Sequence, residues 1–124
     1  MWDGFNKRKF PRLNLRCELT LRSPYASGQV IRTQTENVGA GGICVILNQP
    51  LDRFTPMLIR LELDASLPWI ECEGRVMWSV PVGETASKKK AFDTGVEFLG
   101  LEPAQQDLVR YFVAARLEPE QKFR

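Results

Sequence analysis

Basic residues gather near the start of the chain, where they could hold an anion. Five stand within ten positions with no acidic residue between them: Lys7, Arg8, Lys9, Arg12 and Arg16. The rest of the chain holds the other 12 of the 17 basic residues and all 15 acidic residues, so its net charge is −3. A basic cluster on an acidic body indicates a local anion site and not a broad nucleic-acid-binding face.

Two of these basic residues form a spaced pair around a proline. Arg8 and Arg12 are four positions apart, and Pro11 lies between them. Pro11 fixes its own φ and disfavours helical geometry at Phe10, so the segment is predicted to be an extended arm. An arginine fork can donate two hydrogen bonds to guanine O6 and N7, and its planar face can stack on a base while its charge meets phosphate.

A second segment of interest is the glycine-rich stretch 37–42, with the sequence NVGAGG. Asn37 offers a donor and an acceptor to the edge of a base. The glycines allow backbone N–H groups to approach an anion closely, because no Cβ stands in the way. We expect this stretch to be a break between two strands.

The sequence lacks the residues and motifs that several kinds of catalytic or metal site require. The chain contains no histidine, which excludes a Ser–His–Asp triad and any zinc site that needs histidine. No phosphate-binding loop, dinucleotide fingerprint or outstanding carboxylate pair occurs, so we expect no catalytic residues, no metal site, no cofactor and no enzyme activity. Cys17, Cys44 and Cys72 lie in apolar segments without CxxC spacing and are interpreted as reduced core thiols.

The hydrophobic pattern predicts a mostly β fold. In the first strand, Leu13, Leu15, Cys17, Leu19 and Leu21 alternate with polar residues, which is the period of a half-buried strand. Similar patterns predict six strands, at 13–22, 29–36, 43–47, 57–64, 69–78 and 92–98. In the fifth of these, the residues expected on a common face are Ile70, Cys72, Val76 and Trp78.

The period then changes to that of an amphipathic helix over about 103–117, with Pro103 in its first turn. Six short strands and one helix predict a six-stranded antiparallel β-barrel with a C-terminal α-helix. We divide the chain into a flexible basic arm (1–12), the barrel with its helix (13–118) and a tail (119–124). No stretch reaches the ~20 apolar residues of a membrane span, and the first residues lack the apolar run of a signal peptide. We therefore expect no membrane span, no signal peptide and a cytoplasmic protein.

These motifs together resemble the PilZ family, which is defined by RxxxR followed by [DN]xSxxG. Arg8 and Arg12 match the first motif, and Asn37 and Gly42 match the second. GRVMW at 74–78 and GVEF at 95–98 look like later strands of the family, so the resemblance covers nearly the whole chain.

The resemblance implies a bacterial module that binds the second messenger cyclic di-GMP. It assigns ligand binding to Arg8, Arg12, Asn37, Gly39 and Gly42. Possible further contacts are Lys7, Val38, Ala40, Gly41 and Trp78. The family serine falls at Gly39, and a missing hydrogen bond of about 1–3 kcal/mol would weaken binding roughly five- to a hundredfold.

The resemblance also implies a regulatory role. Ligand would order the N-terminal arm, and a downstream protein partner would couple this change to motility, pili, biofilm or exopolysaccharide output. One alternative is a PilZ-like adaptor that binds no nucleotide and acts through protein contacts, for which Gly39 is the argument. The other alternative is a barrel that binds nucleic acid, and the net negative charge of the rest of the chain argues against it.

Overall fold

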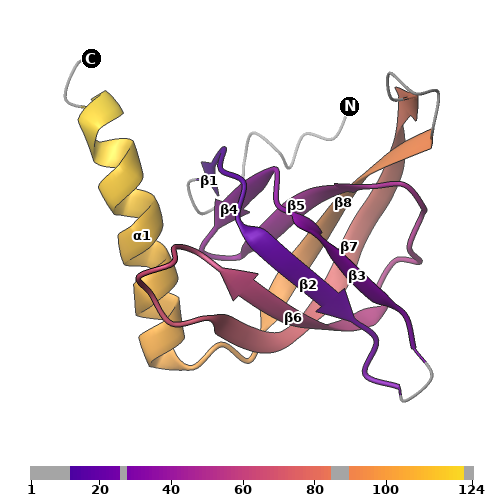
Figure 1. The fold of residues 1–124 in the computed structure, drawn as a ribbon, viewed down its shortest axis with the longest axis horizontal. Helices are drawn as coiled ribbons and strands as arrows, with labels where there is room; N and C mark the ends of the chain where they lie inside the picture. The colour runs from indigo at the N-terminus through magenta and orange to yellow at the C-terminus, as the bar shows by residue number, and fades with distance from the viewer. Residues whose placement is uncertain (1–11, 26–27, 85–89, 122–124) are drawn as a thin grey trace.

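The computed structural model describes residues 12–25, 28–84 and 90–121. In this part of the chain, an antiparallel sheet of eight strand segments precedes one helix (Figure 1). The elements are β1 (Arg12–Leu13), β2 (Glu18–Arg22), β3 (Val30–Gln34), β4 (Asn37–Gly39), β5 (Gly42–Leu47), β6 (Pro56–Glu62), β7 (Ile70–Glu84), β8 (Lys90–Leu99) and α1 (Pro103–Gln121).

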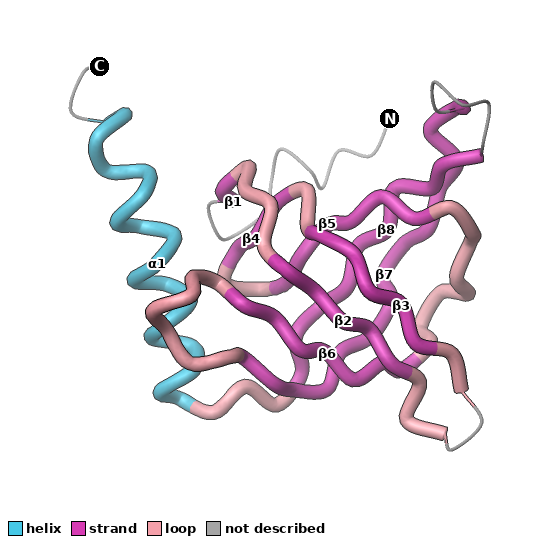
Figure 2. Tube along the Cα trace, viewed as in Figure 1, coloured by secondary structure: helices cyan, strands magenta, loops and turns pink. Residues whose placement is uncertain are grey.

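The sheet curls into a barrel because one long hairpin joins its two ends. The strand order is β1-β4-β5-β8-β7-β6-β2-β3. β1 and β2 are successive parts of one arm of this hairpin, and β3 and β4 are successive parts of the other; β2 pairs with β3, and β1 pairs with β4. The tube view shows the resulting curvature (Figure 2). The predicted antiparallel barrel with a C-terminal helix is confirmed, but the predicted strand 13–22 is divided into β1 and β2, and β4 is an additional strand segment beyond the predicted strand 29–36.

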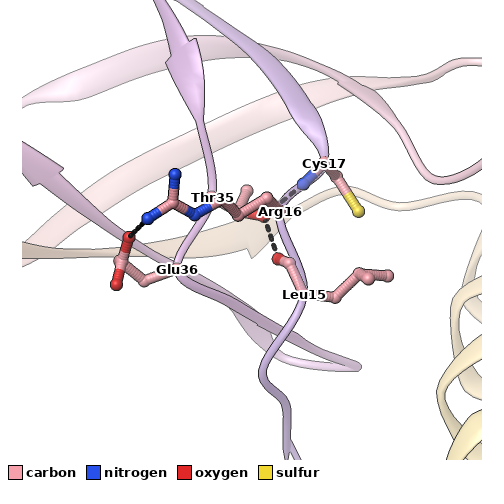
Figure 3. Close-up of polar contacts among 5 residues, drawn as sticks. All are labelled: Leu15, Arg16, Cys17, Thr35 and Glu36. Atoms are coloured by element: carbon pink, nitrogen blue, oxygen red, sulfur yellow. Dashed lines mark hydrogen bonds and ion pairs between the residues drawn. The ribbon is translucent and has the colours of Figure 1, made fainter.

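The division lies at a bulge that Thr35 bridges. Leu13 pairs with Val38 and Glu18 with Gln34, so residues 14–17 face only residues 35–37. One extra residue on one strand is the mark of a β-bulge. The buried Thr35 hydroxyl accepts a hydrogen bond from the Cys17 backbone N–H (2.9 Å) and donates one to the Leu15 carbonyl (2.6 Å), as Figure 3 shows.

The barrel interior is filled by the predicted apolar positions. The alternation along 57–64 predicts that Met57, Ile59, Leu61 and Leu63 face inward, and all four are buried. Val96 and Phe98, which the alternation places on one side of 92–98, are buried as well. From the first strand, Cys17, Leu19 and Leu21 are buried, and Leu13 and Leu15 pack against them while partly exposed. The alternation therefore identified the inner face correctly.

The prediction that Trp78 shares a face with Ile70 and Val76 was wrong. The register of β7 against β8 shifts between Val76 and Trp78, so Val76 faces Val96 whereas Trp78 faces Gly95. The extra residue is Met77, and it reverses the alternation of faces. Trp78 therefore lies on the outer face and not with Ile70 and Val76 in the core.

The segment 37–42 is also more regular than predicted. Instead of a glycine-rich break, it forms β4, a turn at Ala40 and Gly41, and the first residue of β5. β7 extends to Glu84, beyond the expected end at residue 78.

The helix α1 begins at Pro103, as predicted, and continues to Gln121 instead of ending near residue 117. Its start is capped by Gln105, whose side-chain oxygen accepts a hydrogen bond from the Glu102 N–H at 3.1 Å. Val109, Phe112 and Val113 are buried and belong to the same core as the sheet. α1 contacts β1 and β4, beside the hairpin that closes the barrel (Figure 1).

Two of the cysteines have raised pKa values because of burial. Burial raises the pKa of the Cys72 thiol to about 11 and also raises that of Cys17. The Cys17 Sγ donates a weak hydrogen bond to the Leu63 carbonyl at 3.7 Å. Both thiols are therefore protonated at neutral pH, which agrees with their interpretation as core thiols.

Gly42 is required by the close approach of β5 to β8. It pairs with Glu97, and a Cβ at this position would overlap the backbone carbonyl oxygen of Val96. Gly95 differs, because a Cβ there would meet the side-chain ring of Trp78. Backbone cannot move aside as a side chain can, so the two glycines have different tolerance for substitution.

We predict that Thr35→Val destabilises the protein by about 1–3 kcal/mol, because the change keeps the shape of the side chain but removes the partner of a buried N–H and of a partly buried C=O. Urea unfolding followed by circular dichroism measures the loss. Thr33→Val, at a partly exposed position on the same hairpin arm, is the control. Equal unfolding midpoints for wild type and Thr35→Val would contradict the role given to the hydroxyl.

We predict that Gly42→Ala lowers the free energy of unfolding by about 1–3 kcal/mol through overpacking against the β8 backbone. Gly95→Ala should cost less, because the indole of Trp78 can rotate away. Thermal unfolding of both variants gives the comparison. If Gly42→Ala were the more stable of the two, the close approach described above would not constrain the sequence.

Candidate functional site

The predicted glycine motif forms a tight hairpin turn. Gly39 at the end of β4 pairs with Gly42 at the start of β5, and Ala40 and Gly41 make the two-residue turn between them. The Gly41 carbonyl accepts a hydrogen bond from the Phe98 N–H at 3.0 Å. The turn is therefore fixed both to its own hairpin and to β8.

The second predicted arginine lies directly beside this turn. β1 pairs with β4 so that Arg12 stands opposite Gly39, at a strand spacing of about 4.8 Å. The structure thus brings the backbone at the end of the basic arm to the glycine that replaces the family serine. Arg8 and Lys7 lie outside the described residues.

The strand register arranges the neighbouring residues in rows across the sheet. The middle row is apolar and belongs to the core: Leu13, Val38, Ile43, Val96 and Val76. The rows on either side alternate with it and lie on the outer face. We call one the glycine row: Arg12, Gly39, Gly42, Glu97 and Arg75. We call the other the tryptophan row: Asn37, Cys44, Gly95 and Trp78.

These rows separate the predicted contacts by face. Val38 is fully buried in the middle row, so its side chain belongs to the core and does not reach the outer face. Asn37, Gly39, Gly42 and Trp78 stand at outer-face positions of three different strands. Four of the predicted residues are therefore brought to one surface.

A cavity of about 560 Å³ opens on this surface. It is lined by Gly41 and Gly42 of the turn, Trp78 of the tryptophan row, Glu97 of the glycine row and Arg53 of the loop before β6. This volume is within the range of small-molecule sites. The glycine turn and the predicted tryptophan thus share one hollow, with Trp78 packed over Gly95 at its side.

Two of the predicted residues border other hollows. Asn37 lines a separate depression with Arg16 and Glu36, whose side chains approach to 4.0 Å. Ala40 lines a further one together with Arg110 of α1. The structure therefore places Asn37 in the same row as Trp78 but not on the wall of the main cavity.

Sequence reasoning missed the charged residues of the cavity. Arg53 lies in a loop where no periodic pattern marks it. Its guanidinium lies 4.7 Å from the centre of the Phe54 ring, and Phe54 has a left-handed backbone with φ of 70°. Glu97 was part of the quoted GVEF strand, and Arg75, its partner at 2.9 Å, was part of GRVMW. Only the register reveals that Glu97 stands opposite Gly42, with Arg75 as the next residue in the same row.

Arg53 and Glu97, which both line the cavity, give the site a positive and a negative charge. Arginine forks bind phosphate and the acceptor edge of guanine, while a carboxylate binds donor groups. Among the described residues, no cluster of three or more His, Cys, Asp or Glu side chains could hold a metal ion. No helix in the described part of the chain is long and apolar enough to cross a membrane.

Solved structures with the same fold come from several bacteria. The inhibitor of motility MotI/DgrA of Bacillus subtilis is 18% identical, with a TM-score of 0.73 over 90% of this chain and 52% of its own. The PilZ domain of YcgR from Escherichia coli, solved with c-di-GMP, is 11% identical, with a TM-score of 0.68 over 94% of this chain and 96% of its own. MrkH of K. pneumonia, in its c-di-GMP complex, is 17% identical, with a TM-score of 0.67 over 93% of this chain and 55% of its own.

The chain spans about half the length of the MotI and MrkH chains and nearly all of the YcgR domain. No curated protein matches its sequence. The family model described as the PilZ domain matches residues 6–115, which include the arginine pair, the glycine turn, every strand and most of α1. The chain belongs to the PilZ domain family.

Proposed function

We propose that the chain binds cyclic di-GMP on the outer face of the barrel. The observation that carries the proposal is the pairing of Arg12 with Gly39, which joins the end of the RxxxR segment to the [DN]xSxxG turn. The proposed ligand-binding residues are Arg8, Arg12, Asn37, Gly39 and Gly42. Trp78, Gly41 and Lys7 are proposed as further contacts.

Two similar structures support this ligand, because the YcgR PilZ domain and MrkH were solved with c-di-GMP. The chemistry of the site supports it as well. The two arginines offer forks for guanine and phosphate, and the glycine turn offers backbone N–H groups without a covering side chain. Trp78 and the turn line a common cavity that has the size of a small-molecule site.

The proposed role is that of an effector without a chemical step. The two phosphates of the ligand would offset the repulsion among the nearby positive charges (Lys7, Arg8, Lys9, Arg12 and Arg16) and draw the arm onto the outer face. A protein partner would read the new surface. The resulting output would be motility, pili, biofilm or exopolysaccharide synthesis. MotI, which shares the fold, is an inhibitor of motility.

The alternative of a nucleotide-independent adaptor has one observation in its favour. Gly39 stands where the family motif has serine, so the motif hydroxyl is missing at this position. An adaptor would need none of the arginine chemistry described above. Binding measurements separate the two functions.

We predict that calorimetry detects cyclic di-GMP binding to wild type, and that Arg8→Ala and Arg12→Ala each weaken it about tenfold or more, because each loses charged hydrogen bonds worth about 1.5–3 kcal/mol. Arg22→Ala, on β2, is a matched control outside the cavity and should bind as wild type. Absence of binding heat at high micromolar ligand would favour the adaptor. Equal affinity in all variants would remove the arginines from the site.

We predict that saturating cyclic di-GMP slows amide hydrogen exchange in residues 5–12, because an arm bound to the ligand would gain hydrogen bonds that protect its amides. Exchange followed by mass spectrometry measures the protection, with the C-terminal half of α1 as an internal reference. The same exchange rates with and without ligand, in protein shown to be saturated, would contradict ordering of the arm.

A further inference from the structure

Glu97 brings a carboxylate to the wall of the cavity, next to the glycine turn. Its backbone stands opposite Gly42 in the β5–β8 ladder, and its side chain is 33% exposed. Gly42 has no side chain, so nothing from β5 at this register position lies between the carboxylate and the turn. The carboxylate is thus available to a molecule in the cavity.

A neighbouring arginine holds this carboxylate in place. Arg75 faces Glu97 across the β7–β8 ladder, and its Nη2 donates a hydrogen bond to Glu97 Oε1 at 2.9 Å. The Arg75 guanidinium also lies 5.7 Å from the centre of the Phe54 ring. Phe54 is in turn tied to β7 through a hydrogen bond from its N–H to the Val76 carbonyl at 2.7 Å. Glu97 therefore has a fixed orientation before any ligand arrives.

The carboxylate keeps free acceptor capacity. An ionised carboxylate has about four acceptor sites on its two oxygens, and the hydrogen bond from Arg75 uses one. Guanine presents N1–H and N2–H₂ as adjacent donors on its Watson–Crick edge, and two parallel acceptors of a carboxylate match them. Adenine presents an acceptor at N1 instead, so the carboxylate would face another acceptor and could not form this pair of hydrogen bonds. Unpaired polar groups of this kind give strong discrimination between analogues.

The spacing along the glycine row fits a ligand with two bases. Arg12, Gly39, Gly42 and Glu97 occupy four adjacent strands, so Arg12 and Glu97 are three strand spacings apart, about 14 Å. A cyclic dinucleotide carries its two guanines on opposite sides of the phosphate ring. One base can meet the arginine arm while the other lies near Glu97.

The charge of the ligand does not exclude a carboxylate here. Cyclic di-GMP carries two negative phosphates, which would repel Glu97 in isolation. Arg75 pairs with Glu97, and Arg53 lies on the wall of the same cavity. Arg53 and Glu97 contribute one charge of each sign to the wall, and Arg75 adds a second positive charge behind the Glu97 carboxylate through their hydrogen bond, so a dianion can approach.

We propose that Glu97 reads the Watson–Crick edge of one guanine of bound cyclic di-GMP and so selects guanine over adenine, with Arg75 as its positioning residue. This inference rests on the proposed cyclic di-GMP function. It adds a base-selecting residue on β8 to the arginine and glycine motifs, and it assigns the selection of guanine to the rigid sheet.

The test measures the affinity of the full chain for cyclic di-GMP and cyclic di-AMP by calorimetry, in wild type and in Glu97→Gln. The amide of glutamine turns a donor toward the guanine donors. We expect cyclic di-GMP affinity to fall about tenfold to a hundredfold, and cyclic di-AMP affinity to stay unchanged or increase. Glu97→Asp, which keeps the charge on a shorter side chain, should lose less. Arg75→Lys, which keeps the charge but not the fork, should lower the preference for guanine.

Glu71→Gln is the matched control. Glu71 pairs across strands with Arg60 at 3.6 Å, in the same kind of ion pair as Arg75 with Glu97, but it does not line the cavity. This variant should retain both affinities. Thermal unfolding of every variant confirms that the binding measurements compare folded proteins.

Each outcome separates the inference from the function on which it rests. If Glu97→Gln keeps the wild-type ratio of the two affinities, or weakens both ligands equally, Glu97 does not select the base and only the inference fails. If wild type binds neither ligand, the proposed function fails and the inference fails with it. A fall in the ratio for Glu97→Gln, with no fall for Glu71→Gln, supports the inference.

Discussion

The pairing of β1 with β4 is the constraint on which the site depends, and the bulge bridged by Thr35 sets its register. If the β2–β3 register continued without the bulge, Leu13 would stand opposite Gly39. The extra residue between β1 and β2 instead places Arg12 opposite Gly39 and Leu13 opposite Val38. A one-residue slip exchanges the two faces of a strand. The hydroxyl of Thr35 therefore helps to decide which residue of the arm faces the core and which faces the glycine turn.

The outer face can form a site because glycines occupy its positions on three adjacent strands. Gly39, Gly42 and Gly95 are outer-face residues of β4, β5 and β8. Glycine weakens a strand, so its presence usually marks a close approach by another group. For Gly42 that group is the Val96 carbonyl, and for Gly95 it is the Trp78 ring. Gly42 and Gly95 thus have structural roles, and for Gly42 this role comes in addition to the proposed ligand contact.

Features that follow a periodic pattern of apolar residues could be predicted from the sequence, and features set by the pairing register of the strands could not. Alternation identified the core of three strands, and helical spacing with Pro103 located the start of α1. Trp78 was misplaced because one residue, Met77, interrupts an otherwise regular strand, and no local signal marks a bulge. Glu97 was missed for a related reason. Its position beside Gly42 follows from pairing between strands far apart in the chain, which neither spacing nor composition encodes.

The proposed site has two parts, the arginine arm and the carboxylate of Glu97, and they differ in what they can contribute to recognition. Guanidinium groups attract any phosphate and stack on any base, so an arginine arm supplies affinity and fast association more readily than selectivity. A carboxylate held by Arg75 within a paired ladder is already oriented, and a preorganised group loses little entropy when a ligand binds. Selection between bases that differ by single donor and acceptor groups needs that fixed geometry. The β7–β8 ladder meets this requirement, since its hydrogen bonds exist before the ligand arrives.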